Sequence, residues 1–331
     1  WENGNLTYKI DYLISLGYIL KKYKLRQTSK TFTEVDSKYN RQISAIGKEG
    51  QKKLQETKVG IVGVGGTGSM IAEQLVRLGV RDIIITDFDK FEESNLTRMY
   101  GSYYENLFLF NSPVLPRSSK YKVSIIEKNL RRINPKLKLN CQSKNIVLTD
   151  TVKDILDRDV IFSCTDEHWG RSIINQICYQ YLIPTINTGV RIATENDQFK
   201  TGTIVSHLLI PDKPCLWCSE YLSASRIYAE STCKEEREKL VNEGYIENIN
   251  DKAPSVITFT SLGSSLSMMI FLNLITGYLG DYGEFSTLRF DMKMVDLRRG
   301  KASVKEDCIC RKVLGKGDFA NLFTIKELPE S

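Results

Sequence analysis

A glycine-rich turn has the residue types and spacing that bind phosphate groups. Four glycines follow one short apolar run and precede another: Gly63, Gly65, Gly66 and Gly68. Glycines let the backbone approach an anion closely, and the free N–H groups of a helix N-terminus favour negative charge. Asp87 closes the next apolar run, 19 positions after Gly68 (87 − 68), where a carboxylate can bind ribose hydroxyls. The spacing predicts a nucleotide site, with Asp89 as a second polar contact or a turn residue.

Charged residues around this turn suit ATP cleavage better than hydride transfer. Arg98, Lys122 and Arg41 can neutralise the charge of a pentavalent phosphate and of a pyrophosphate leaving group. Asp166 ends an apolar run and is a natural magnesium ligand, although the position also suits a helix N-cap. An NAD-dependent oxidoreductase would use the same turn but gives Arg98 and Asp166 no role. It is kept as the remote alternative.

Two close pairs of cysteines can hold a metal ion. Their members are Cys215, Cys218, Cys308 and Cys310. Two such pairs from distant segments can supply four thiolates to a tetrahedral structural zinc that clamps the C-terminal segment. The alternative is four unrelated buried thiols. The second pair has one residue between its cysteines, where two are usual.

The remaining cysteines have other expected roles. Cys141, Cys164 and Cys178 lie in apolar segments and are expected in the core. Cys233 lies in a polar stretch beside a lysine, at the start of an expected helix, where a thiol pKa can fall. It is either a nucleophile or an ordinary surface thiol.

Strands alternate with helices through the first two thirds of the chain. This order predicts an α/β fold with a doubly wound, mainly parallel, Rossmann-like sheet. Strands are expected at 58–62, 82–87, 138–143, 159–164 and 185–187, and helices at 68–78, 118–133, 150–157 and 169–181. Strands at 200–209 and 287–304 suit an antiparallel extension, with a charged helix at 231–243 and an apolar helix at 257–279 between them. The segment 102–121 is expected to be a mobile loop over the site.

Composition limits the class of protein. The chain has 331 residues, 41% of them hydrophobic, and a net charge of +6, with no basic face rich in aromatic residues; nucleic-acid binding is therefore not expected. Polar residues interrupt the apolar run 257–279, so we expect a core or interface helix and no membrane span. No secretory signal is visible, and eight cysteines then favour a reducing, cytoplasmic location.

Together these motifs resemble the ThiF/MoeB/ubiquitin-activating superfamily over roughly residues 39 to 310. The resemblance rests on 39–43 (Tyr-Asn-Arg-Gln-Ile), 59–69, 87–89, 94–98 (Ser-Asn-Leu-Thr-Arg), the helix ending at Asn134-Pro135, and 164–166. It implies a homodimer or pseudodimer that adenylates a carboxylate with ATP and magnesium. The implied roles are phosphate contacts for Asn95, Arg98 and Lys122, phosphate contact from either subunit for Arg41, ribose binding for Asp87, and magnesium binding for Asp166.

The N-terminal extension favours one branch of that superfamily. Residues 8–24 are expected to form an amphipathic helix ending near Gly17 and then a strand, like the tail of a winged-helix module, and 25–38 a linker. The alternative is a helix docked on the main domain. The layout is closest to peptide-modifying members such as MccB and PaaA, in which a peptide-clamp domain precedes adenylation. We therefore expect an extension at 1–38 and an adenylation domain at 39–331, with a crossover region at about 219–256.

Two other functions stay open. One is activation of a ubiquitin-like protein or sulfur carrier at its C-terminus, with or without a thioester at Cys233. Thioester-forming members carry their nucleophile just before the long apolar helix, where this chain has 251–256 (Asp-Lys-Ala-Pro-Ser-Val) and no cysteine. The other is a catalytically inactive scaffold subunit, which the presence of all the phosphate-binding cations disfavours.

Overall fold

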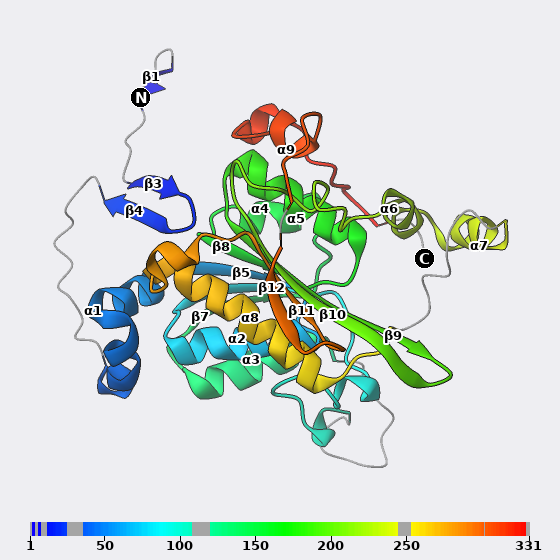
Figure 1. Cartoon of the computed structure of the whole chain (residues 1–331), viewed down its shortest axis with the longest axis horizontal. Coiled ribbons are helices and arrows are strands. Elements are labelled where there is room, and N and C mark those ends of the chain that lie inside the picture. Colours follow the sequence, from blue (N-terminus) through cyan, green and yellow to red (C-terminus); the bar gives the residue numbers. More distant parts are fainter. Residues whose placement is uncertain are drawn as a thin grey trace.

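A mixed β-sheet organises the molecule (Figure 1). The computed structural model describes residues 2–3, 6–7, 12–24, 36–107, 120–243, 253–300 and 302–328. Within them, the main sheet has the strand order β12-β11-β10-β9-β8-β5-β6-β7. The parallel part comprises β5 (Lys58–Val62), β6 (Asp82–Thr86), β7 (Lys138–Gln142), β8 (Val160–Ser163) and the start of β9 (Thr185–Glu195). The antiparallel extension comprises β10 (Gln198–Leu209), β11 (Thr287–Asp291) and β12 (Asp296–Arg299). The predicted doubly wound sheet with an antiparallel extension is confirmed.

The strand order creates a crevice where a ligand can bind. The chain runs from β5 outward to β6 and β7, then returns to place β8 on the other side of β5. Loops that leave β5 and β8 therefore diverge to opposite faces at the carboxyl edge of the sheet, which is where open α/β sheets bind ligands. The glycine turn follows β5, and Asp166 follows β8.

Helices cover both faces of the sheet, and side chains that alternate along each strand pack against them. Ile61 and Phe162 face the cluster formed with α2 (Gly66–Leu78), α3 (Lys122–Ile133) and α8 (Ile257–Thr276). Val62 and Ile161 face the opposite cluster, formed with α4 (Thr149–Ile155) and α5 (His168–Tyr181). The period of two in the strand sequences thus sets the two-sided core.

The apolar helix α8 belongs to this core. By length and composition it could cross a membrane, but 56% of its most apolar window is buried inside the fold. It packs against α2, β9 and β10. Its polar residues bond inward: Ser264 Oγ donates to the carbonyl of Thr67 at 2.9 Å, and Ser267 Oγ donates to Ser206 Oγ at 3.0 Å. These contacts explain why serines interrupt the apolar run, and they confirm the expected core helix.

The predicted helix before Gly17 is wrong for the residues that the structure describes. Strands β3 (Tyr12–Leu16) and β4 (Leu20–Lys24) form an antiparallel hairpin, while residues 8–11 and the linker up to 35 lie outside the described part. β-Branched and aromatic side chains on both sides of a glycine turn favour a hairpin over a helix. Lys22 Nζ lies 2.9 Å from Asp159 Oδ1, so the hairpin docks on the main domain. Two shorter strands, β1 (Glu2–Asn3) and β2 (Leu6–Thr7), pair with each other.

Three other element boundaries differ from the sequence prediction. The charged helix is two helices, α6 (Ala224–Ser231) and α7 (Lys234–Asn242), because Thr232 and Cys233 have extended backbone. The last expected strand is the β11–β12 hairpin, and α3 begins at Lys122 because the preceding residue is extended. Helix α1 (Asn40–Glu56) precedes β5, and the short α9 (Ile309–Lys312) follows β12. Most of the expected loop (108–119) and of the late crossover (244–252) lies outside the described residues.

A buried ion pair holds the amino edge of the parallel strands, opposite the crevice. Arg158 is 3% exposed, and its Nη1 lies 2.6 Å from Asp82 Oδ1. Burial alone would raise the pKa of the Asp82 carboxyl. Hydrogen bonds from Lys138 and Arg158 outweigh this effect and hold the pKa below its ordinary value. This pair therefore stabilises the fold above the ordinary pKa of an aspartate, and the contribution is lost as pH falls through the depressed pKa.

Replacing Arg158 with methionine is expected to cost about 3 kcal/mol of unfolding free energy at pH 7, because Asp82 stays half-buried with one partner fewer. The difference from the parent protein should shrink as the pH falls through the depressed pKa of Asp82. Urea denaturation over a series of pH values from neutral to strongly acidic measures it. Arg131→Met is the matched control, since Arg131 forms an exposed helix pair with Glu127 and should cost under about 1 kcal/mol. Equal losses in the two variants would contradict the assignment.

Candidate functional site

Two of the glycines in the turn are required by the backbone itself. Gly63 has φ of +87°, and a Cβ there would lie 2.7 Å from the backbone nitrogen of Thr165. A Cβ on Gly68 would lie 1.9 Å from the carbonyl oxygen of Gly63. No side chain fits either position. These contacts bring the turn after β5 against the loop after β8.

Gly65 has a different environment, because a Cβ there would meet no atom within 4 Å. Gly65 is the N-cap of α2, and no side chain among the described residues caps the backbone N–H groups of that helix end. Gly66 follows it, with the side chain of Arg98 3.4 Å from where its Cβ would be. The first turn of α2 thus offers open space, N–H donors and a nearby guanidinium, which together suit a phosphate group.

Asp87 holds the turn in place. Its carboxylate accepts hydrogen bonds from the backbone nitrogen of Val64 at 2.7 Å and from that of Asp89 at 2.8 Å. Burial raises the pKa of Asp87, opposed by the nearby charge of Lys122. Both carboxylate oxygens are engaged, but each has a second acceptor position. Ribose binding by Asp87 stays a prediction.

Asn95 shapes the loop that carries Arg98. Its Oδ1 accepts from the backbone nitrogen of Glu92 at 2.9 Å, which caps the short 3-10 helix Glu93–Asn95. Asn95 is buried, whereas Arg98 is partly exposed and donates from Nη1 to the carbonyl of Ser94 at 3.0 Å. The sequence prediction that Asn95 contacts phosphate therefore competes with an observed structural role.

Asp89 follows β6, and Asp166 and Glu167 follow β8, so the three acids lie at the same edge of the sheet, which we call the acidic edge. Lys122 Nζ lies 2.6 Å from Asp89 Oδ2. Burial, and then the charges of Glu230, Asp166 and Asp89, raise the pKa of Glu167 to about 8. Asp166 itself is exposed. Carboxylates gathered at one edge supply the oxygen ligands that a divalent cation such as Mg²⁺ prefers.

Sequence reasoning missed Glu230 and Glu167. Glu230, on α6, accepts from the backbone nitrogens of His168 at 3.0 Å and Trp169 at 2.6 Å, so it caps α5 directly after Asp166. The backbone nitrogen of Ser223 donates to His168 Nδ1 at 3.0 Å. These bonds fix helix α6 to the acidic edge. Glu167 adjoins Asp166 and could have been noticed as a pair of acids after a strand; Glu230 has no sequence signal.

Arg41 is not brought to this edge within the chain. It lies exposed in the first turn of α1, and the structure gives it no hydrogen bond or ion pair to any described residue. A role for Arg41 at the phosphates therefore needs a second subunit, and it stays a prediction.

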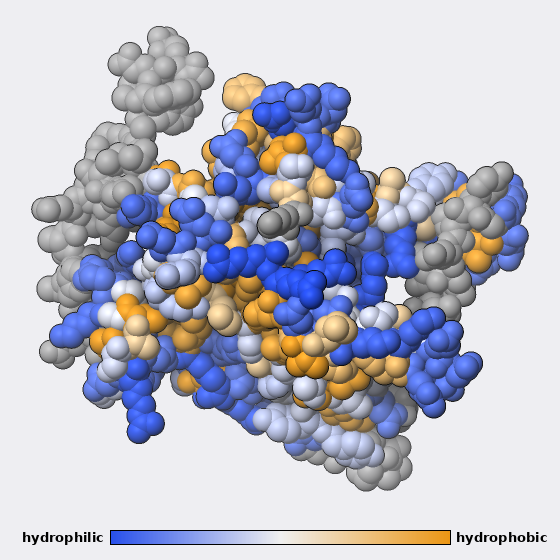
Figure 2. All heavy atoms as spheres, viewed as in Figure 1, coloured by the Kyte–Doolittle hydropathy of each residue, from blue (hydrophilic) through white to orange (hydrophobic). Residues whose placement is uncertain are grey.

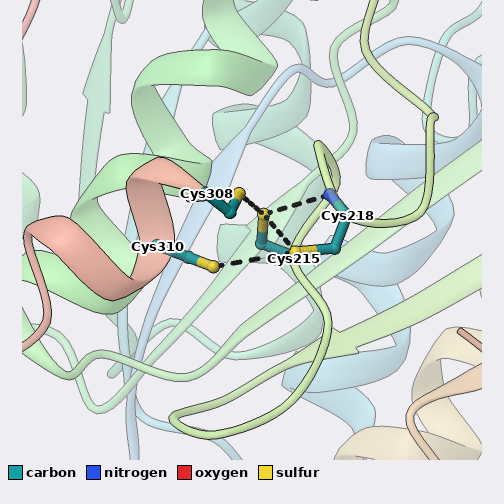
Figure 3. Close-up of side chains that lie close together, drawn as sticks. All are labelled: Cys215, Cys218, Cys308 and Cys310. Carbon is teal, nitrogen blue, oxygen red and sulfur yellow. Dashed lines mark hydrogen bonds between the residues drawn. The ribbon is translucent and has the colours of Figure 1, made fainter. Parts of the chain in front are cut away.

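The four paired cysteines converge, as Figure 3 shows. The Sγ atom of Cys215 lies 3.6 Å from the Sγ of Cys218 and 3.4 Å from that of Cys308. The Sγ atoms of Cys218 and Cys310 lie 3.8 Å apart. A disulfide needs about 2.05 Å, whereas a tetrahedron of sulfurs at 2.3 Å from zinc has edges of about 3.8 Å. The backbone nitrogens of Cys218 and Lys305 each lie 3.4 Å from a cluster sulfur. The spacing and the N–H donors fit a structural zinc, and the shortened second pair does not prevent convergence.

The other cysteines are core or surface thiols. Cys178 is buried, and Cys141 and Cys164 are partly buried against the main core. Burial raises the pKa of Cys141 and of Cys164 to about 12, so neither is a nucleophile at neutral pH. Cys233 is partly exposed and is the N-cap of α7, three positions after Glu230. Its role as a nucleophile stays a prediction.

Sequence comparisons relate the chain to a known family. The family model described as "ThiF family" matches residues 39–309. Ubiquitin-like modifier-activating enzyme 5 of Gallus gallus is 28% identical over 198 residues, which are 56% of this chain and 45% of that protein. The enzyme of the same name from Rattus norvegicus is 27% identical over 219 residues, 61% of this chain and 50% of that protein. The chain thus spans about half the length of the curated relatives it matches.

Solved structures share the fold at lower identity. E. coli MccB, in a crystal structure with ATP, is 20% identical with a TM-score of 0.61, covering 83% of this chain and 75% of that one. MccB in complex with N-formylated MccA has a TM-score of 0.62 with the same coverage and identity. PaaA is 18% identical with a TM-score of 0.57, covering 83% of this chain and 87% of the other. At these identities the likeness extends to the fold.

Proposed function

The chain belongs to the ThiF family, and on that premise we propose that it is an ATP-dependent adenylyltransferase that activates a carboxylate on a peptide substrate. One observation carries the proposal: the N-terminus of α2 has open space at Gly65 and the Arg98 side chain beside Gly66. Asp87 joins this turn to Asp89, which is paired with Lys122. A dinucleotide site needs the glycines but neither the cations nor the acidic edge.

The chemistry follows from this arrangement. A carboxylate oxygen of the substrate attacks the α-phosphorus of ATP, the bond to the bridging oxygen breaks, and acyl-adenylate and pyrophosphate form. Arg98 and Lys122 neutralise the charge that develops on the phosphates, and α2 orients them with its N–H groups. Asp166, with Asp89 nearby, would hold Mg²⁺, which when bound neutralises phosphate charge. Asp87 keeps the turn rigid and supplies acceptor positions for ribose.

A peptide is the substrate class that we favour. The N-terminal hairpin docks on an adenylation domain that we place at 39–331, and the solved neighbours include MccB in complex with N-formylated MccA. The crossover 219–256 has no cysteine next to α8. The alternative is activation of a ubiquitin-like protein, which the identity with ubiquitin-like modifier-activating enzyme 5 supports. In that case Cys233 is the thiol to test for a thioester.

ATP–pyrophosphate exchange tests the proposal. The protein is incubated with ATP, Mg²⁺ and labelled pyrophosphate, together with each member of a panel of peptides with free carboxylates and of ubiquitin-like proteins. Label should appear in ATP with at least one peptide. Exchange with ubiquitin-like proteins alone would select the alternative. Binding of NAD⁺ in preference to ATP, with exchange absent throughout, would revive the oxidoreductase.

Gly65→Ala is expected to weaken ATP binding by a factor of about 30, or about 2 kcal/mol, while the melting temperature stays within a few degrees of the parent. The added methyl meets no protein atom but takes space where a phosphate would lie. Gly68→Ala is the contrasting variant, because its methyl collides with the Gly63 carbonyl and should destabilise the fold itself. Calorimetric titration with ATP and thermal denaturation measure the two effects. Unchanged ATP affinity in Gly65→Ala would move the phosphates elsewhere.

We further propose that the four-cysteine cluster binds a structural zinc ion. The four thiols lie within 4.8 Å of one another and come from two segments 90 positions apart (308 − 218), so the ion would clamp the C-terminal segment onto the loop after β10. We also propose a cytoplasmic location, because eight cysteines in a chain of this length favour a reducing compartment.

A second copy of the chain is the partner that we propose for the face formed by α8 and the β11–β12 hairpin. Figure 2 shows apolar side chains on this face. Met269 on α8 is 43% exposed, Val295 is 75% exposed, and Leu297 on β12 is 47% exposed. Light scattering should give twice the mass of one chain, and Met269→Glu together with Leu297→Glu should give a monomer. A monomeric parent protein would contradict the homodimer.

A further inference from the structure

A cavity of about 560 Å³ lies beside the acidic edge and has no part in the chemistry above. Its walls come from four segments: α5, α6, the cysteine cluster and the C-terminal segment. The lining is aromatic and aliphatic: Trp169, Trp217, Ile227, Tyr228, Ile309 and Phe323. Its volume is in the range of about 300–1,000 Å³ typical of sites that bind small molecules or side chains.

The serine and glutamine side chains of the lining are already bonded within the protein. Ser172 Oγ donates to the carbonyl of Trp169 at 2.7 Å, Ser231 Oγ donates to that of Tyr228 at 3.0 Å, and Gln176 Nε2 donates to that of Asn321 at 2.7 Å. No Asp, Glu, Lys, Arg or His is among the lining residues. A charged or strongly polar ligand would lose its hydration without compensation here, so the cavity selects an uncharged apolar group.

Helix α6 connects this cavity to the adenylation edge. Ala224, Ile227, Tyr228 and Ser231 have helical spacing and line the cavity. Glu230, on another face of the same helix, caps α5 at His168 and Trp169. Trp169 therefore has its backbone at the edge that follows Asp166 and its side chain in the wall of the cavity.

We propose that this cavity binds an aromatic or branched aliphatic side chain of the polypeptide whose carboxylate is adenylated, which rests on the proposed function. The cavity shares α6 and the first turn of α5 with the acidic edge, so a single polypeptide can extend from one to the other. The substrate is the ligand that must reach that edge. Its uncharged side chain matches a lining that contains no Asp, Glu, Lys, Arg or His. Activation then depends on the peptide sequence as well as on a free carboxylate.

Intrinsic fluorescence reports occupancy directly, because Trp169 and Trp217 are two of the three tryptophans in the chain. N-acetyl-leucinamide should give a saturable change in emission, and N-acetyl-glutaminamide a response at least fivefold weaker. Ala224→Phe fills the cavity and should weaken the binding of N-acetyl-leucinamide at least tenfold. Ser225→Phe, the matched control, places the same ring at the next position, which is not among the lining residues, and should bind the fragment as the parent does. No saturable response, or equal binding to Ala224→Phe and the parent, would overturn the proposal.

Pyrophosphate exchange then tests the occupant. Two pools of dodecapeptides with free C-terminal carboxylates are compared, one complete and one without Phe, Ile, Leu, Met, Val, Trp and Tyr. The complete pool should support exchange at least tenfold faster, and Ala224→Phe should remove the difference. Equal rates with the two pools overturn the proposal. Fragment binding without exchange from either pool contradicts the proposed function, whereas exchange without fragment binding contradicts only the cavity.

Discussion

Replacing Asp166 with asparagine is expected to lower ATP–pyrophosphate exchange by a factor of about 10² to 10³, with little effect on folding. Loss of one preorganised charge contact to a phosphoryl transition state has effects of this size. Asp166 is exposed, and the acidic residues nearby raise the pKa of Glu167, so asparagine should relieve repulsion within the edge. The loss is therefore expected in catalysis, and the melting temperature should stay the same or rise slightly.

The dependence on magnesium separates a metal ligand from a helix cap. If Asp166 holds Mg²⁺, the variant should need a higher magnesium concentration for half-maximal exchange, whereas a lost cap would lower stability at every concentration. Asp150→Asn is the matched control, since Asp150 is an exposed aspartate at the start of another helix, 82% exposed in its side chain. An unchanged magnesium requirement with full activity would show that the metal is held elsewhere.

The sequence was most informative where a function depends on residues close together in the chain. The glycine turn, Asp87 and the two cysteine pairs each depend on short spacings that the fold preserves. The alternation of strand and helix segments predicts parallel strands. Parallel strands in turn place Asp166 at the carboxyl edge of the sheet. None of these inferences required knowledge of distant contacts.

The contacts that were missed join distant segments or depend on local backbone competition. Glu230 caps a helix that begins 62 positions earlier in the chain, and no local pattern encodes this contact. The 12–24 hairpin was predicted as part helix, because five residues with mixed apolar and polar side chains suit both periods. The break at Thr232 and Cys233 fell within a charged run that otherwise favours one helix. The cavity depends on four segments at once, so only the fold reveals it.

Cys310→Ser is expected to remove bound zinc and to lower the melting temperature by about 10 °C. A structural zinc site contributes its binding free energy to folding, about 10–16 kcal/mol in zinc-finger peptides. Here the rest of the core folds around the site, so we expect the loss of zinc to lower the unfolding free energy by about 3–5 kcal/mol. Each kcal/mol lowers the melting temperature of a domain of this size class by about 2–4 °C. Elemental analysis of the purified protein and thermal denaturation measure the two effects.

Cys233→Ser provides the matched control for zinc and a separate test of the thioester. Cys233 lies outside the four-sulfur cluster, so this variant should keep one zinc per chain and the parent melting temperature. Loss of acyl transfer with intact pyrophosphate exchange in this variant would favour a thioester enzyme over direct transfer from the adenylate. Full zinc content in Cys310→Ser would show that the four thiols do not form a single metal site.

The same zinc experiment connects the cluster to the substrate cavity. Trp217 lies between Cys215 and Cys218, Ile309 lies between Cys308 and Cys310, and both side chains line the cavity. Loss of zinc should release these two walls while β5, α2 and the glycine turn stay packed in a separate core cluster. Cys310→Ser should therefore lose the fluorescence response to N-acetyl-leucinamide yet bind ATP with the parent affinity. A parallel loss of ATP binding would mean that the metal supports the whole fold and not the cavity alone.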